Sequence, residues 1–314
     1  MPFFEDAYAI WALSVAYDMT RSARYLHTCR HWADRVVALQ DRMIPTGAYY
    51  MNYGRQPGSD QGDSYVADCG SIAMGVLATS IRVTNVADKL RYLDSVKAWA
   101  KLVIQNYTCK SGGITNGIWG YTPEWWGSTA TAGALLFRLY SETALPEYLD
   151  VALRASDWMG MQGLRGAVNP SFEQDAPSVV YYCGQFYGMT LNPPVLAAGQ
   201  TGVADAQIAV AVKWLAENQK GRGAASSIDY LYDTYMAGMP YLMYLFAAGK
   251  PQFPELGAAA DEELRYISAI LFDDGPPDAT LLKTWELISW AMMSYAARLR
   301  PGGLIRNSAD TTKS

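Results

Sequence analysis

Two aspartates, Asp229 and Asp233, stand directly before an uncharged run that lasts until Lys250 in "SSIDYLYDTYMAGMPYLMYLFAAGK". Their i,i+4 spacing puts both carboxylates on one face of a helix that includes Asp229. Two close carboxylates raise each other's proton affinity, and burial beside apolar surface such as the Tyr232 ring acts in the same direction. An acid that keeps its proton near neutral pH suits general acid catalysis, while the competing interpretation is an ordinary helix cap.

Other acids also stand at the starts of apolar segments. Asp68 precedes "CGSIAMGVLATSI", Glu124 precedes "WWGSTATAGALLF", and Glu286 opens the last such segment. These segments carry no charge and are rich in Ala and Gly, which predicts buried helices that pack closely. Acids are common in the first turn of any helix. As a set at one end of the buried helices they indicate a site, and Asp68 joins the candidate catalytic residues.

An internal repeat predicts how these helices are arranged. "YLHTCRHWADRVVALQ" at 25–40 is echoed by "YLDSVKAWAKLVIQN" at 92–106 and more weakly at 148–162, 204–219 and 260–274. The echoing segments alternate charged and apolar faces, so we expect outer helices that each pair with an inner, uncharged one. The predicted pairs are 6–40, 65–106, 124–162, 179–218 and 229–273, with a last inner helix at 281–298.

This pattern predicts an all-α protein of about eleven helices, arranged as an (α/α)6 toroid of alternating inner and outer helices. One domain would cover residues 1–300, and residues 301–314 would form a flexible tail. An irregular helical bundle and an open helical solenoid are the alternatives.

In a ring of hairpins, the loops that lead from outer to inner helices all emerge on one face, which we call the mouth. These loops are the long ones, at 41–64, 107–124, 163–178, 219–228 and 274–280, and they are rich in aromatic rings, amides and arginines. Rings stack on sugar faces, while amides and arginines bind hydroxyls and carboxylates. Candidate substrate-binding residues in the loops and at the inner-helix starts are Trp125, Trp126, Tyr232, Trp285, Arg55, Arg222, Tyr53, Tyr181 and Gln185, beside Tyr49, Tyr50 and Asn116. A protein-binding patch is the alternative.

Composition excludes several partners. The chain has 314 residues, 50% of them hydrophobic and only 18% charged, with a net charge of −5, which argues against nucleic-acid and anionic-membrane partners. No apolar run is long enough to span a membrane, and no secretion signal precedes the first helix, so we expect a cytoplasmic protein. Four separated cysteines are typical of free thiols in a reducing compartment.

Motifs for cofactor or metal chemistry are weak. His27 and His31 are spaced i,i+4, but they sit among arginines and no third histidine exists in the chain. There is no GxSxG hydrolase motif, and "CKSGGITNG" lacks the order of a phosphate-binding loop. We therefore expect no metal and no cofactor.

Two segments resemble a known family. "YDTYMAGMPYL" at 232–242 is similar to the inner-helix motif of unsaturated glucuronyl and unsaturated rhamnogalacturonyl hydrolases, which belong to the six-hairpin (α/α)6 glycosidases, and "VADCGSIAMG" at 66–75 resembles their Asp-x-Gly motif. The resemblance implies that Asp233 is the proton donor that hydrates the C4=C5 double bond of an unsaturated uronic sugar. It implies that Asp68 is the assisting acid, whereas the i,i+4 spacing favours Asp229 as the partner.

The sequence thus favours a glycoside hydrolase that acts on uronic-acid-containing oligosaccharides or polysaccharides through Asp233 with Asp229 or Asp68. Arg55 or Arg222 would bind the uronate carboxylate. One alternative is a polysaccharide lyase on the same toroid, in which Tyr50, Tyr53 or Tyr181 would abstract a proton. Another is a toroid that binds a glycan or a protein without catalysis.

Overall fold

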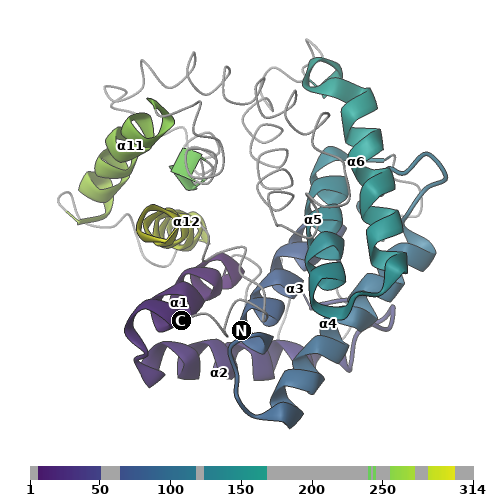
Figure 1. Ribbon diagram of the computed structural model, residues 1–314, viewed down its shortest axis with the longest axis horizontal. Coiled ribbons are helices and arrows are strands. Elements are labelled where there is room, and N and C mark those ends of the chain that lie inside the picture. The colour runs from purple at the N-terminus through teal and green to yellow at the C-terminus, as the bar shows by residue number, and fades with distance from the viewer. Residues whose placement is uncertain are drawn as a thin grey trace.

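The computed structural model describes residues 6–50, 64–117, 124–167, 240–241, 243–244, 255–272 and 282–300 of the chain. In these ranges the chain forms eight α-helices, and apart from two isolated bridges in loops it forms no β-structure (Figure 1). The helices are α1 (Asp6–Thr20), α2 (Ala23–Gln40), α3 (Val66–Ser80), α4 (Val86–Asn106), α5 (Trp126–Thr143), α6 (Pro146–Ala167), α11 (Glu255–Phe272) and α12 (Leu282–Leu299). The expectation of an all-α protein is confirmed for this part of the chain.

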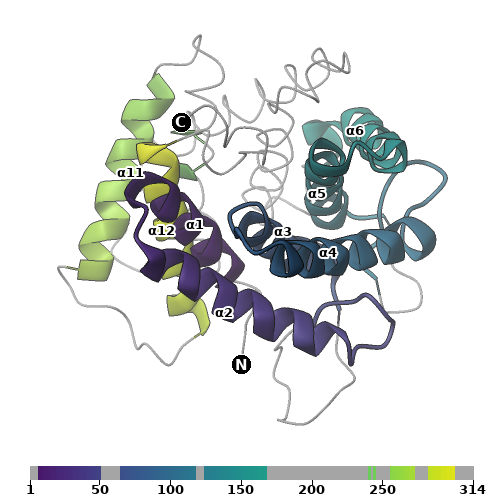
Figure 2. The same ribbon diagram turned by 60° about the horizontal axis from the view of Figure 1, so that its bottom comes forward.

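Four of these helices form an inner row. Helix α1 packs against α12 on one side and against α3 on the other, and α3 packs in turn against α5. Helices α2, α4 and α6 pack against α1, α3 and α5 and lie farther from the middle of the view in Figure 1. Figure 2 shows α2 along the lower side of the described helices. The predicted pairs 6–40, 65–106 and 124–162 are therefore confirmed as helical hairpins.

The last described helix of the chain lies beside the first. Helix α12 packs against both α1 and α11, so segments from the two ends of the chain are neighbours. In α11, the carboxylate of Asp261 accepts a hydrogen bond from the Tyr244 hydroxyl at 2.6 Å and pairs with Arg298 of α12 at 2.9 Å. This closure is consistent with an α/α toroid. The predicted pair 179–218 lies outside the described residues.

The inner helices are buried because their sequences are apolar and small. In α3, 13 of 15 residues are buried, whereas in α2 only 6 of 18 are. A Cβ atom built on Gly70 would lie 3.0 Å from the Thr131 side chain of α5, and one on Gly75 would lie 3.0 Å from the Trp32 ring of α2. The small residues thus allow the close helix packing that the sequence predicted.

A buried ion pair joins α1 and α3 at the end opposite the mouth. The Arg82 guanidinium follows α3 and lies 2.9 Å from the Asp18 carboxylate near the end of α1, and both side chains are almost fully buried. Arg82 also donates to the Ala78 carbonyl oxygen at 2.9 Å. Both charges are buried away from water, and each is stabilised by the opposite charge of the other. The pair therefore holds the ends of α1 and α3 together.

One predicted boundary is wrong. Helix α6 continues to Ala167, although the sequence predicted an end at residue 162 and a loop from residue 163. Residues 163–167 contain two glycines but no proline, and a glycine only lowers helix stability by about 1 kcal/mol, so it need not end a helix.

Candidate functional site

Loop 107–117 holds the starts of the inner helices α3 and α5 together. The backbone amide of Val66 donates to the Asn116 carbonyl oxygen, and the amide of Ala67 donates to Asn116 Oδ1, both at 3.2 Å. On the other side, the Ile114 carbonyl oxygen accepts hydrogen bonds from the Trp125 amide at 3.1 Å and from the Ser128 hydroxyl at 2.6 Å. The loop therefore fixes two neighbouring parts of the mouth relative to each other.

Asp68 lies in the first turn of α3 at this mouth. It is half-buried, and the two amides before it already have Asn116 as their acceptor. The Asp68 carboxylate is therefore not the group that caps these two donors. An acid in the first turn is stabilised by the helix dipole, which suits a carboxylate that assists a reaction in its ionised form.

Trp125 is an exposed aromatic residue at the start of α5. Its side chain is 39% exposed, and a Cβ atom built on Gly127 would lie only 2.4 Å from its ring. The indole therefore lies across the first turn of α5, in the space that glycine leaves. A large ring held in this way, partly open to solvent, can stack on a sugar.

Glu124 is anchored to the protein beside Trp125. Its carboxylate accepts a hydrogen bond from the indole nitrogen of Trp158 at 3.1 Å and another from the Ser111 hydroxyl. Gly113 makes this possible, because a Cβ atom there would lie 2.7 Å from the Trp158 ring and 2.9 Å from the Glu124 side chain. These contacts indicate that Glu124 holds loop 107–117 in place, so its role is to position the loop.

The thiols near the mouth are not poised for nucleophilic chemistry. Burial raises the pKa of Cys69 to about 12, and the Asp68 charge adds to this effect, although a hydrogen bond with the Ser64 hydroxyl and one donated to the Tyr49 carbonyl oxygen oppose it. Partial burial and the Glu124 carboxylate also raise the pKa of Cys109. Because the thiolate is the reactive form, carboxylates remain the better catalytic candidates among the described residues.

Two tyrosines that the sequence assigned to the mouth lie in the core. Tyr49 is fully buried and its hydroxyl lies 2.9 Å from the Ser95 hydroxyl of α4. Tyr50 is 7% exposed and packs with Met43 and Leu102. Their assignment to a sugar-binding surface is wrong, and the burial of Tyr50 also removes it as an exposed lyase base.

The other predicted site residues fall where the structure gives no side-chain description. Trp126 is the first residue of α5 and Trp285 lies in the first turn of α12, so both stand at inner-helix starts as expected, but their side chains lie outside the described residues. The remaining candidates lie wholly outside the described residues: Asp229, Asp233, Tyr232, Arg55, Arg222, Tyr53, Tyr181 and Gln185.

His27 and His31 are exposed on α2, an outer helix, as the sequence predicted. In the described ranges, no three His, Cys, Asp or Glu side chains gather where they could hold a metal ion. None of the described helices combines the length and the apolar character that a membrane span requires.

Comparisons with known proteins support the fold. No protein-family model and no curated protein sequence matches this chain. A family 76 glycoside hydrolase from a bovine Bacteroides thetaiotaomicron strain superposes with a TM-score of 0.58 and 13% identity, over 94% of this chain and 68% of the other. The Lin0763 protein from Listeria innocua gives a TM-score of 0.58 and 15% identity, over 96% of this chain and 86% of the other. At such identities the likeness concerns the fold alone, and it agrees with the all-helical, α/α arrangement of the described residues.

Proposed function

We propose that this protein is a glycoside hydrolase that cleaves uronic-acid-containing oligosaccharides, with unsaturated uronyl sugars as the favoured class. The observation that carries the proposal is the fold likeness to a family 76 glycoside hydrolase, which extends over 94% of the chain. A second supporting observation is the half-buried carboxylate of Asp68 in the first turn of α3, at the predicted mouth. The Asn116 side chain accepts a hydrogen bond from the Ala67 amide beside it.

In this proposal the chain forms one closed (α/α)6 domain over residues 1–300, and the mouth holds the sugar. Asp233 is the general acid, and Asp68 or Asp229 is its partner. Trp125 forms part of the sugar-binding surface, because its ring is partly exposed and is held across Gly127. Arg55 or Arg222 pairs with the uronate carboxylate, because guanidinium groups bind carboxylates in a bidentate manner.

The reaction that the family resemblance implies needs no nucleophile at the anomeric carbon. Asp233 gives its proton to C4 of the double bond, and a water oxygen adds to C5 while the partner carboxylate takes the water's proton. The resulting hemiketal opens by breaking the bond between C5 and the ring oxygen. The sugar then releases the next unit as an alcohol and becomes an aldehyde, so one water is consumed for each bond cleaved.

Free thiols support a cytoplasmic location as part of the same proposal. Cys29, Cys69 and Cys109 are unpaired, and two of them are buried in the core. Reduced cysteines of this kind are typical of proteins from reducing compartments.

The proposal is tested by incubating the purified protein with a panel of polyuronides and of unsaturated oligosaccharides made from them by a lyase. The ultraviolet absorbance of the C4=C5 double bond is followed over time. Loss of the absorbance on an unsaturated oligosaccharide is the expected result. A gain on an intact polyuronide would indicate a lyase, and no change on any substrate would contradict both activities.

A further inference from the structure

The solvent face of α2 carries an unbalanced line of positive charge. Successive residues of a helix rotate by about 100°, so Arg24, His31 and Arg35 lie within about 20° of one line, and His27 flanks it. All four side chains are exposed. The opposite face of α2, with Trp32 and its buried neighbours, packs into the core, so this line cannot turn inward.

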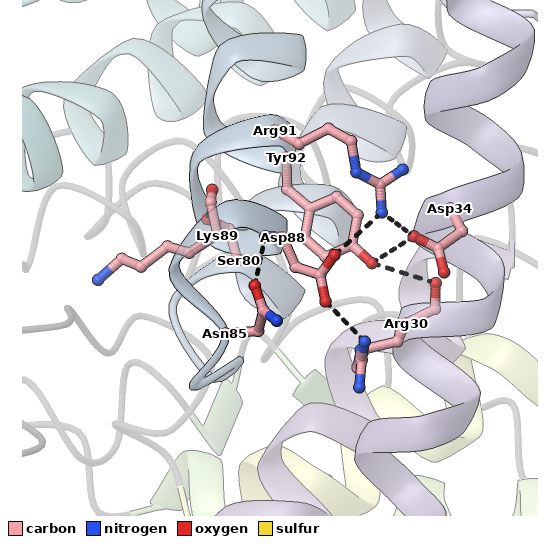
Figure 3. Close-up of polar contacts among 8 residues, drawn as sticks. All are labelled: Arg30, Asp34, Ser80, Asn85, Asp88, Lys89, Arg91 and Tyr92. Atoms are coloured by element: carbon pink, nitrogen blue, oxygen red, sulfur yellow. Dashed lines mark hydrogen bonds and ion pairs between the residues drawn. The ribbon is translucent and has the colours of Figure 1, made fainter.

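Two acids between α2 and α4, Asp34 and Asp88, are already paired with other arginines. Asp88 of α4 pairs with Arg30 at 2.6 Å, and Asp34 of α2 pairs with Arg91 and accepts a hydrogen bond from the Tyr92 hydroxyl at 2.6 Å (Figure 3). Partial burial raises the pKa of Asp34, but hydrogen bonds from Tyr92 and Arg91 outweigh it and keep that pKa below its ordinary value. Both acids are therefore committed to the α2–α4 contact.

Arg24 and Arg35 have no partner of opposite charge among the residues that the structure describes. Within the described ranges, neither guanidinium lies at ion-pair distance from a carboxylate. Residues 21–42 contain five arginines and two aspartates, a net charge of +3, in a chain whose net charge is −5. This segment is therefore positively charged although the chain as a whole is negatively charged.

The form of this line fits a long anion better than a small one. Arg24 and Arg35 are separated by eleven positions along the helix, or roughly 17 Å, with His31 between them. A single carboxylate or phosphate touches one arginine at a time, whereas a linear polyanion meets them in succession. Helix α2 starts at the end of the molecule that holds the Asp18–Arg82 pair, since α1 ends there, and runs toward the mouth. The line therefore leads to the proposed site.

We propose that Arg24, His31 and Arg35 form a binding track for an acidic polysaccharide, which guides or holds the polymer beside the mouth. The choice of a polyuronide as occupant rests on the proposed function. Arginine suits this occupant because its planar donors match a carboxylate. A membrane surface fits less well. Helices that lie on a membrane bury an apolar face in it, whereas no large hydrophobic residue of α2 is exposed.

The test compares binding of sodium polygalacturonate to the full chain and to the double variant Arg24→Gln/Arg35→Gln, by affinity electrophoresis at low salt. The matched control is Lys101→Gln/Arg265→Gln, which removes two exposed positive charges from the outer helices α4 and α11. We expect the first variant to bind roughly tenfold more weakly, because two exposed charge contacts are lost. The control should bind like the unchanged protein, and raising the salt should remove the difference.

Three results would overturn the track. Equal binding by both variants would show that the line makes no contact with the polymer. Equal binding of a neutral polymer such as dextran would show that charge is not what is recognised. Tighter binding of phosphatidylserine vesicles or duplex DNA, with the same loss in the first variant, would assign the line to another occupant. Because binding is measured without turnover, a protein that binds polygalacturonate but cleaves no uronide would refute the proposed function and leave the track standing.

Discussion

Replacing Asn116 by alanine tests whether loop 107–117 positions the acid in the first turn of α3. The substitution removes the Oδ1 acceptor of the Ala67 amide and leaves the backbone bond from Val66 to residue 116 in place. Loss of a capping acceptor of this kind costs about 1 kcal/mol in the free energy of unfolding. In a chain of 314 residues that corresponds to a fall in Tm of roughly 1–2 °C.

The effect on catalysis should be larger than the effect on stability. If Asp68 takes part in the reaction, a shift of about 1 Å in the first turn of α3 can cost up to roughly 100-fold in rate. We expect kcat of Asn116→Ala to fall about tenfold or more, with a smaller change in KM. The assay is the loss of double-bond absorbance on an unsaturated uronyl oligosaccharide, combined with thermal unfolding followed by circular dichroism.

Asn106→Ala is the matched control. This asparagine also makes one side-chain hydrogen bond to a helix backbone, to the Leu102 carbonyl oxygen at 3.2 Å, but it is exposed at the end of α4. Its kcat should equal that of the unchanged protein. If Asn116→Ala lowers Tm and leaves kcat equal to that of the control, then the loop is only structural and the argument for Asp68 fails.

Three further outcomes follow from the described contacts. Arg82→Met should lower the free energy of unfolding by about 3–5 kcal/mol in urea denaturation, because it removes the guanidinium that pairs with the buried Asp18 carboxylate at 2.9 Å. Gly127→Ala should raise KM with kcat nearly unchanged, because the added methyl group must displace the Trp125 ring. Asp34→Asn should reduce the loss of Tm between neutral pH and about pH 3, since a carboxyl whose pKa is lowered by folding stabilises the protein above its ordinary pKa of about 3.9 and loses that contribution as the pH falls.

Each of these outcomes has its own control or contrary result. Gly257→Ala in α11 is the control for Gly127→Ala, because a Cβ atom there has no neighbour within 4 Å, so KM should stay unchanged. An equal rise in KM in both glycine variants would show that displacement of the Trp125 ring is not the cause. Urea midpoints that are equal for Arg82→Met and the unchanged protein would mean that the ion pair contributes little. If Tm falls with pH in the same way in Asp34→Asn and in the unchanged protein, then ionisation of Asp34 does not contribute to the stability of the fold.

Helix type and pairing could be predicted from the sequence because burial leaves a direct compositional signal. The run from Cys69 to Ile81 has no charge and several small residues, and it is the buried helix α3, while the echoing segment at 92–106 is part of the outer helix α4. The contact of α12 with α1 also follows from the expected ring. These features follow from the spacing of charged and apolar residues and from the repeat, both of which can be read from a single sequence.

Loop chemistry could not be predicted in the same way. Tyr49 and Tyr50 have the residue type of a sugar-binding surface, but a tyrosine suits a buried site equally well once a partner such as Ser95 is available. That partner lies 46 positions away in the chain. Asn116 was predicted only as a loop amide, because its bonds to the start of α3 depend on how two hairpins meet. Composition gives residue types in a loop, and only the packing of neighbouring hairpins gives their contacts.

The central claim is that a carboxylate at the mouth protonates an unsaturated uronic sugar, and Asp233→Asn tests it most directly. The measurement is the rate of loss of double-bond absorbance for the variant and the unchanged protein, with binding of the same oligosaccharide measured by calorimetry. We predict a loss in kcat of at least about 100-fold with binding retained, because general acid catalysis contributes roughly 10²–10⁴-fold. A variant that turns over the sugar at the rate of the unchanged protein would contradict the account.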